Sequence, residues 1–266
     1  MIERDLLREL LQGGRLIPFV GSGLSQPLGL PSWSSLLDTI AIQLGYEPEV
    51  YRSNGNALQL AEYYVVEKGS IGPLRSEMDR LFDPSDEAIR ASKVHSLLVD
   101  LHAPAIYTTN YDRIIERAFE LKGAPYHTIA NIDDLATAPP DATLIVKFHG
   151  TFSDDASLVL TESSYFERLE FESALDIKLR ADTLGKSLLF LGYSLGDINI
   201  RYLLYRLHKL RRRAGREGQR TPSAYLLAFG AGEIQRKLLA QWDVEVIELD
   251  PLDKTASVES FMRSLL

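Results

Sequence analysis

The chain has no cysteine in its 266 residues. That absence excludes disulfide bonds, a cysteine-ligated zinc site and a cysteine nucleophile, and it fits a reducing compartment such as the cytoplasm. Long apolar runs are missing as well, because no segment approaches the roughly 20 apolar residues that a membrane helix needs, and the first residues are mostly charged. We therefore expect a soluble cytoplasmic protein with neither a signal peptide nor a membrane helix.

An excess of positive charge is also absent. The formal net charge is -8 at pH 7, whereas proteins that bind nucleic-acid phosphates usually present a basic surface, so direct nucleic-acid binding is not expected. One basic cluster lies at the end of a predicted helix. It is either a solvated helix end, where cations offset the helix dipole, or a contact for a partner or nucleic acid. The cluster consists of Lys209, Arg211, Arg212, Arg213, Arg216 and Arg220.

Short apolar segments alternate with helical patterns through most of the chain. The predicted strands are residues 16–20, 105–107, 126–129, 143–148, 187–191, 224–229 and 244–249. The predicted helices include residues 2–11, 113–121, 164–183, 199–212 and 233–242. Alternation of this kind indicates parallel strands joined by crossover helices. We predict an α/β fold with a Rossmann-like, doubly wound and mainly parallel sheet.

Three sequence details refine the predicted fold. Residues from about 45 to 100 have helical periodicity, so we expect a helical insertion within a single domain that covers residues 1–266. Pro18 lacks a backbone N–H and indicates that strand 16–20 lies at a sheet edge or starts there. Ser32 or Ser34 is expected to cap the next helix. The buried side of that helix is predicted to comprise Leu36, Leu37, Ile40, Ile42 and Leu44.

Four loops rich in small and hydrogen-bonding residues directly follow predicted strands. They are residues 21–25 (Gly-Ser-Gly-Leu-Ser), 108–112 (Thr-Thr-Asn-Tyr-Asp), 147–150 (Lys-Phe-His-Gly) and 192–197 (Gly-Tyr-Ser-Leu-Gly-Asp). Ligands of open α/β sheets bind outside the carboxyl ends of the strands. The loops therefore predict a nucleotide pocket at that edge of the sheet.

The first loop has the composition of a phosphate-binding turn. Gly21 and Gly23 allow close approach of the backbone, and the amides before the next helix can bind a phosphate at its positive end. Ser22 and Ser25 add hydroxyl donors. A tight turn requires the same glycines, however, and the loop has neither the third glycine of the usual dinucleotide motif nor the Gly-Lys-Ser/Thr of a Walker loop.

The loops after residues 107 and 191 contain polar residues that can either contact a ligand or cap the following helix. Asn110 and Asp112 can present an amide and a carboxylate to a sugar hydroxyl and a carboxamide, although Asp112 can equally cap the following helix. Ser194 beside Gly192 is a candidate phosphate donor. Asp197 either shapes the pocket or caps the helix 199–212.

His149 is the candidate general base. It follows an apolar run and directly precedes Gly150, which places an imidazole at a strand tip. An imidazole there can accept a proton near neutral pH, although a single histidine is more often structural. The other four histidines match no motif and are expected to be structural. They are His95, His102, His127 and His208.

Together the four loops resemble the motifs of the sirtuin superfamily, and more closely its bacterial NAD-hydrolysing branch of the antiphage-defence type than its deacetylases. Residues 21–25 resemble the family's Gly-Ala-Gly-x-Ser loop, and residues 109–112 resemble its Gln-Asn-Ile-Asp segment. The pair at 149–150 matches the family's catalytic His-Gly, and residues 192–194 are similar to its Gly-Thr-Ser. The resemblance covers nearly the whole chain.

This resemblance implies NAD as the substrate and assigns roles to the residues. Asn110 and His149 would be catalytic, and Asp112 would contact the carboxamide. The phosphate and cofactor contacts would be Gly21, Ser22, Gly23, Ser25, Gly192 and Ser194. Deacetylases of the family carry a four-cysteine zinc module and an Asp-Phe-Arg segment, and this chain has neither cysteine nor that segment at Ser32-Trp33. No metal is expected, and the implied reaction is hydrolysis of NAD to nicotinamide and ADP-ribose.

Two other classes of function stay open. The same scaffold can support an NAD-dependent ADP-ribosyltransferase or deacylase, or a binding module that senses NAD or ADP-ribose. An NAD-depleting enzyme also needs a silent state. The resemblance to antiphage systems implies activation by homo-oligomerisation or by a partner in trans, such as a helicase-like ATPase or an argonaute.

Overall fold

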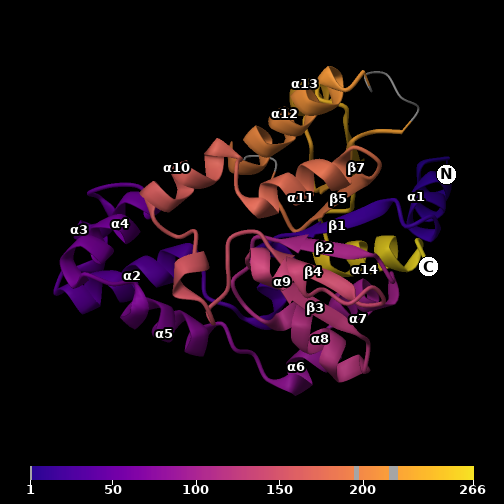
Figure 1. Cartoon of the computed structure of the whole chain (residues 1–266). Coiled ribbons are helices and arrows are strands. Elements are labelled where there is room, and N and C mark those ends of the chain that lie inside the picture. The colour runs from indigo at the N-terminus through magenta and orange to yellow at the C-terminus, as the bar shows by residue number, and fades with distance from the viewer. Residues whose placement is uncertain (1, 195–197, 216–220) are drawn as a thin grey trace.

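A computed structural model describes residues 2–194, 198–215 and 221–266. Within these ranges one seven-stranded sheet has the order β3-β4-β2-β1-β5-β6-β7, and neighbouring strands pair in parallel throughout (Figure 1). The strands are β1 Leu16–Val20, β2 Ala105–Thr108, β3 Tyr126–Ile129, β4 Thr143–Lys147, β5 Ser187–Leu191, β6 Ala224–Ala228 and β7 Val244–Glu248. The predicted α/β, doubly wound parallel sheet is confirmed.

Helices cover both faces of the sheet, which explains why its strands read as continuous apolar runs. One face packs against α1 Ile2–Gln12, α6 Asp86–Ala91, α7 Lys93–Asp100, α8 Ile114–Lys122 and α14 Lys254–Arg263. The other face packs against α11 Ala174–Thr183, α12 Ile198–Arg213 and α13 Glu233–Ala240, with the short α9 Ile132–Ala136 at its border. In β1 the neighbours Phe19 and Val20 belong to opposite faces, as the alternation of strand side chains requires.

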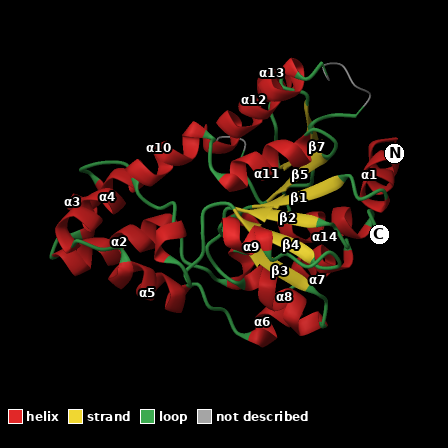
Figure 2. Cartoon of the chain, in the orientation of Figure 1, coloured by secondary structure: helices red, strands yellow, loops and turns green. Residues whose placement is uncertain are grey.

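A second group of helices forms a lobe beside the sheet (Figure 2). Its members are α2 Trp33–Leu44, α3 Pro48–Arg52, α4 Ala57–Lys68 and α5 Gly72–Leu81. They share a separate apolar cluster, to which Phe152, Leu158 and Leu160 also contribute. Residues 45–100 are helical as predicted, but α6 and α7 within that stretch pack on the sheet rather than in the lobe. The boundaries of the insertion stay a prediction.

The segment after β4 connects the lobe to the sheet. It contains the short 3-10 helix Asp155–Ser157 and α10 Glu162–Glu170, and two further 3-10 turns, Ser22–Leu24 and Gln26–Leu28, follow β1. The predicted helix 164–183 is in fact two helices, because Phe171 adopts a left-handed backbone (φ 63°) that ends α10. No helix in the described ranges is long and apolar enough to cross a membrane.

Two other local predictions were wrong and one was right. Pro18 lies in the middle of the central strand β1, not at an edge or a strand start. Its missing N–H is tolerated because β1 pairs with β2 only from Phe19 onward. Ile42 is 69% exposed rather than buried, since Ala41 takes the inward position. Ser32 caps α2 as expected, its Oγ accepting a hydrogen bond from Ser35 N–H.

The order of the strands places a crevice next to β1. The chain leaves β1 for β2 on one side, and later returns to β5 on the other side. Loops that diverge at such a switch point leave a crevice outside the carboxyl ends of the strands, which is where doubly wound sheets bind their ligands.

Candidate functional site

A cavity of about 1070 Å³ opens at this switch point. The loops after β1, β2, β4 and β5 all line it, so the structure brings together most of the residues that the sequence singled out. The predicted residues in the lining are Ser22, Gly23, Asn110, Asp112, His149, Gly192 and Ser194. The lobe and α10 complete the wall with Trp33, Leu36, Met78, Tyr165 and Arg168. Gly21 and Ser25 are outside this lining, and Asp197 lies outside the described residues.

The glycines after β1 and β5 bring two loops into main-chain contact. Gly21 N–H donates to the Leu191 carbonyl at 2.8 Å, and Gly23 N–H donates to the Gly192 carbonyl at 3.1 Å. A Cβ at Gly23 would lie 2.7 Å from Gly192 O, and a Cβ at Gly192, whose φ is +74°, would lie 2.4 Å from Leu24 N. These glycines are therefore required by packing, whether or not a phosphate also binds there.

Ser25 faces away from the cavity, into the protein. Its Oγ lies 3.2 Å from His95 Nε2, and His95 Nδ1 lies 2.7 Å from Ser92 Oγ. Ser25 and His95 are fully buried, and burial lowers the pKa of His95 to about 4. This contact fixes the first loop to α7, and a phosphate role for Ser25 stays a prediction.

Asn110 is held by its backbone and keeps an unused donor. Its N–H donates to Thr108 Oγ1 at 3.0 Å, and the same hydroxyl donates to the Val20 carbonyl at 2.8 Å. The amide nitrogen Nδ2 is buried and has no acceptor among the described residues. A buried donor without an acceptor is costly. Asn110 is thus suited to donate to a ligand oxygen in the cavity that it lines.

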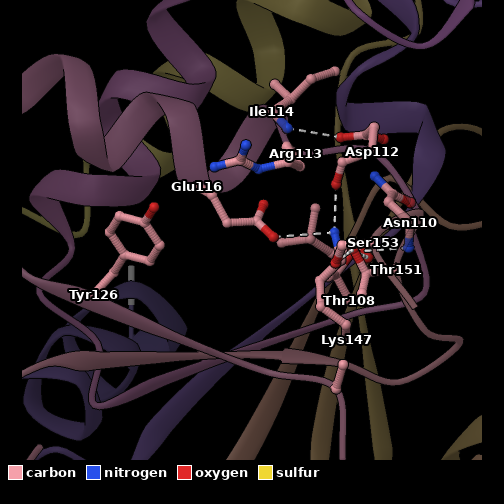
Figure 3. Close-up of polar contacts among 12 residues, drawn as sticks. Thr108, Asn110, Asp112, Arg113, Ile114, Glu116, Tyr126, Lys147, Thr151 and Ser153 are labelled. Atoms are coloured by element: carbon pink, nitrogen blue, oxygen red, sulfur yellow. Dashed lines mark hydrogen bonds and ion pairs between the residues drawn. The ribbon is translucent and has the colours of Figure 1, made fainter. Parts of the chain in front are cut away.

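Asp112 has the capping role that the sequence left open, and it lines the cavity as well. Its Oδ1 accepts a hydrogen bond of 3.0 Å from the N–H of Ile114, the first residue of α8 (Figure 3). Burial raises the pKa of this carboxyl, while the nearby charge of Lys147 acts in the opposite direction.

His149 lies between aromatic rings at the end of β4. Its ring is 6.2 Å from the Phe148 ring and 5.4 Å, edge-on, from the Tyr165 ring. Burial, together with the positive charge of Arg168, lowers the pKa of His149 to about 3. The imidazole is therefore neutral at physiological pH and can accept a proton, although the same shift makes it a weaker base than an ordinary histidine.

Gly150 allows this strand tip to turn sharply. Its φ is +86°, and a Cβ at this position would lie 2.1 Å from the Ser157 carbonyl oxygen. The carbonyl of His149 accepts a hydrogen bond of 3.0 Å from Val159 N–H, and Tyr111 OH donates to the Val159 carbonyl at 2.7 Å. The loops after β2 and β4 thus share one support.

Arg168 and Tyr193 are site residues that the sequence reasoning missed. Arg168, on α10, lies with its guanidinium 3.9 Å from the centroid of the Phe148 ring. Its Nη1 bonds Ser173 Oγ at 2.6 Å, whereas Nε and Nη2 are buried without an acceptor in the described part of the chain. Tyr193 OH donates to the Val20 carbonyl at 2.9 Å and lies 2.8 Å from Thr109 Oγ1.

Sequence signals for these two residues were weak or absent. Arg168 lies in an ordinary polar helix far from the four loops, and only the fold brings it to His149. Tyr193 lies within a recognised loop, yet nothing local indicates that its hydroxyl reaches β1. Across the described residues, no group of three or more His, Asp or Glu side chains is placed to hold a metal ion.

Comparison with known proteins shows the family of the chain. The model of the SIR2-like domain matches residues 104–247, a range that contains Asn110, Asp112, His149 and Ser194. A protein named NAD(+) hydrolase ThsA from Enterococcus faecium is 32% identical over 199 residues, which are 74% of this chain and 40% of that protein. Its namesake from Bacillus cereus (strain MSX-D12) is 31% identical over 207 residues, 77% of this chain and 42% of that protein.

A more distant relative is named as a defence-associated protein. Defense-associated sirtuin 2 of Bacillus subtilis is 26% identical over 215 residues, which are 77% of this chain and 20% of that protein. The chain therefore spans about two fifths of the length of the hydrolases it matches and one fifth of the defence protein.

Proposed function

Because the chain belongs to the SIR2-like domain family, we propose that it hydrolyses NAD+ to nicotinamide and ADP-ribose as the NAD-depleting effector of a bacterial antiphage defence system. The observation that carries the proposal is the meeting of four loops, with Asn110 and His149 among them, around one cavity of about 1070 Å³ at the switch point of the sheet. The names of the relatives from Enterococcus faecium and Bacillus subtilis support the reaction and the biological role.

The pyrophosphate binds at the glycine-rich side of the cavity. Ser22 and Ser194 line this side and offer hydroxyl donors, and the main-chain contact between Gly23 and Gly192 holds the two loops together. Ser25 supports the first loop from within through His95. Main-chain amides in such loops favour an anion without any basic side chain.

The nicotinamide ribose binds at the side formed by the loops after β2 and β4. The free donor of Asn110 orients the ribose or the attacking water, and Asp112 contacts the carboxamide. Positive charge grows on the ribose as nicotinamide leaves, and the neutral imidazole of His149 takes a proton from water or a ribose hydroxyl. Burial, together with the positive charge of Arg168, keeps that imidazole unprotonated before the reaction.

The protein acts in the cytoplasm as a homo-oligomer, and a partner in trans such as a helicase-like ATPase or an argonaute activates it. Exposed apolar side chains on the mutually packed helices α2, α3 and α4 support an assembly role for the lobe. They are Ile42, Val50 and Val66, with 69%, 56% and 70% exposure.

The test is nicotinamide release from NAD+ by the purified protein over a range of protein concentrations. His149→Ala should lower kcat by about 10²- to 10⁴-fold, the usual contribution of general-base help, with the fold retained. Asn110→Ala should also lower kcat with the fold retained, because the ribose or the attacking water loses its donor. His127→Ala is the matched control, because His127 is bonded to the Asp134 carbonyl at 2.8 Å outside the cavity lining.

Three outcomes would contradict the proposal. Full activity of a folded His149→Ala variant would remove the histidine from the mechanism. NAD+ binding without turnover, both by the protein alone at any concentration and together with its activating partner, would indicate a sensor. Transfer of ADP-ribose to a protein, seen as a mass increase, would indicate a transferase.

A further inference from the structure

Lys147 is a completely buried charge, and Figure 3 shows it with Asn110, Asp112 and Glu116. It is the last residue of β4, two positions before His149, and its side chain is 0% exposed. Lysine is almost never fully buried unless its ammonium group is paired, because removing a charge from water is costly. The partners of Lys147 must therefore offset that cost.

Both partners of Lys147 lie in the segment that follows the neighbouring strand β2. Its Nζ donates a hydrogen bond to the main-chain carbonyl of Asp112, and it forms an ion pair with Glu116 Oε1 at 3.4 Å. Glu116 is in the first turn of α8 and is itself 3% exposed. The side chain thus ties the strand that leads to His149 to the loop that carries Asn110.

The short segment 110–112 is held at both ends. At its start, Asn110 N–H donates to Thr108 Oγ1 at 3.0 Å. At its end, the Asp112 carbonyl accepts from Lys147 and the Asp112 carboxylate accepts from Ile114 N–H at 3.0 Å. Asn110 Nδ2, buried and without an acceptor in the described residues, lies between these two anchors. The anchors occupy backbone groups and leave this donor available for a ligand.

We propose that Lys147 is a positioning residue for NAD+ cleavage, an inference that rests on the proposed hydrolase function. By holding the Asp112 carbonyl, it sets the Asn110 amide relative to His149. Lys147 acts without contacting the ligand, since it is not among the residues that line the cavity. A methionine would fill most of the same volume, yet it would leave the carbonyl without its donor and allow the loop to move.

Glu116 provides the matched control. Glu116→Gln keeps an oxygen that can face Nζ, and it leaves the bond from Lys147 to Asp112 in place. This variant should keep kcat near that of the wild type. The double variant Lys147→Met/Glu116→Leu removes both charges of the ion pair, and the Asp112 carboxylate keeps its hydrogen bond from Ile114 N–H.

The experiment measures kcat and KM for NAD+, together with thermal stability, for the wild type and these three variants. A misplaced group near the reacting atoms can lower the rate by about 10²-fold. We expect a decrease of that order in kcat for Lys147→Met, with KM nearly unchanged. The double variant should regain stability without regaining kcat.

Different outcomes reject different statements. Wild-type kcat in a folded Lys147→Met variant would overturn the positioning role, as would recovery of kcat along with stability in the double variant. If the wild type releases no nicotinamide even together with its activating partner, the hydrolase function fails and this inference fails with it. Equal activity of the wild type and the Lys147→Met variant would support the hydrolase function and reject only the positioning role of Lys147.

Discussion

The two sides of the cavity are built in opposite ways. Next to β1 and β5, the loops meet through main-chain atoms, and Gly23 and Gly192 provide the space. Next to β2 and β4, the loops are joined by a buried ammonium and a buried carboxylate, Lys147 and Glu116. At the first side, a Cβ added to either glycine would collide with the opposite loop, and at the second side, removal of Lys147 would leave Glu116 as an unpaired buried charge. The first arrangement suits binding of an anion by amides, and the second suits fixed placement of reacting groups.

The largest effect on folding should come from breaking the charged side. Removal of one partner from a buried ion pair typically costs about 3–5 kcal/mol, because the other charge is left unpaired. Lys147→Met should lower the free energy of unfolding by about that amount, and the double variant with Glu116→Leu should return close to the wild type. Urea unfolding followed by circular dichroism measures both. Additive losses in the double variant would show that the two charges do not stabilise each other.

At the side of the cavity formed by the loops after β1 and β5, a larger side chain in place of glycine should lower the free energy of unfolding. Gly192→Ala and Gly14→Ala both place alanine at a positive φ, +74° and +63°, but a Cβ at Gly14 meets nothing within 4 Å. Gly14→Ala should cost about 1–2 kcal/mol from backbone strain alone. Gly192→Ala should cost about 1–3 kcal/mol more, because its Cβ would collide with Leu24 N. Equal values from thermal or urea unfolding would mean that the two loops can separate freely.

The last effect, absent at neutral pH, is a pH dependence from the histidine behind the first loop. The pKa of His95 is lowered to about 4 in the folded protein, so the unfolded chain binds more protons between pH 6.5 and 4. Stability that is present above pH 6.5 is therefore lost as the pH falls through this window, by up to about 1.4 kcal/mol per pH unit.

His95→Gln isolates this contribution. The free energy of unfolding of this variant should decline less between pH 6.5 and 4 than that of the wild type. His149 makes a similar contribution in both proteins, so it cancels when the two free energies are subtracted. An identical slope in urea unfolding at several pH values would mean that His95 can be protonated in the folded state.

The fold was largely predictable because its strands are buried on both faces. Segments such as residues 187–191 are apolar at almost every position, and they lie at regular intervals between helical patterns. The prediction for Pro18 was wrong because it assumed that a central strand is hydrogen-bonded to both neighbours at every residue. The pairing of β1 with β2 begins one residue after Pro18. Phe171 ends a helix in a left-handed conformation without the glycine that usually indicates such an end.

The candidate site was predictable where it depends on loops, and unpredictable where it depends on distant contacts. Asn110 and His149 follow strands and line one cavity as expected. The contact of Ser25 with His95 spans 70 residues, and Arg168 reaches Phe148 from a separate helix. Such pairings depend on how helices pack on the sheet, and short-range patterns carry no information about that.

The helix α10 belongs to two parts of the molecule at once. Ser163 N–H, at its start, donates to Glu62 Oε2 of α4 at 2.9 Å, and Tyr165 and Arg168 further along the helix surround His149. The helix that supplies part of the electrostatic surroundings of His149 is therefore bonded at its other end to the lobe, so the lobe and the catalytic side of the cavity share one structural element.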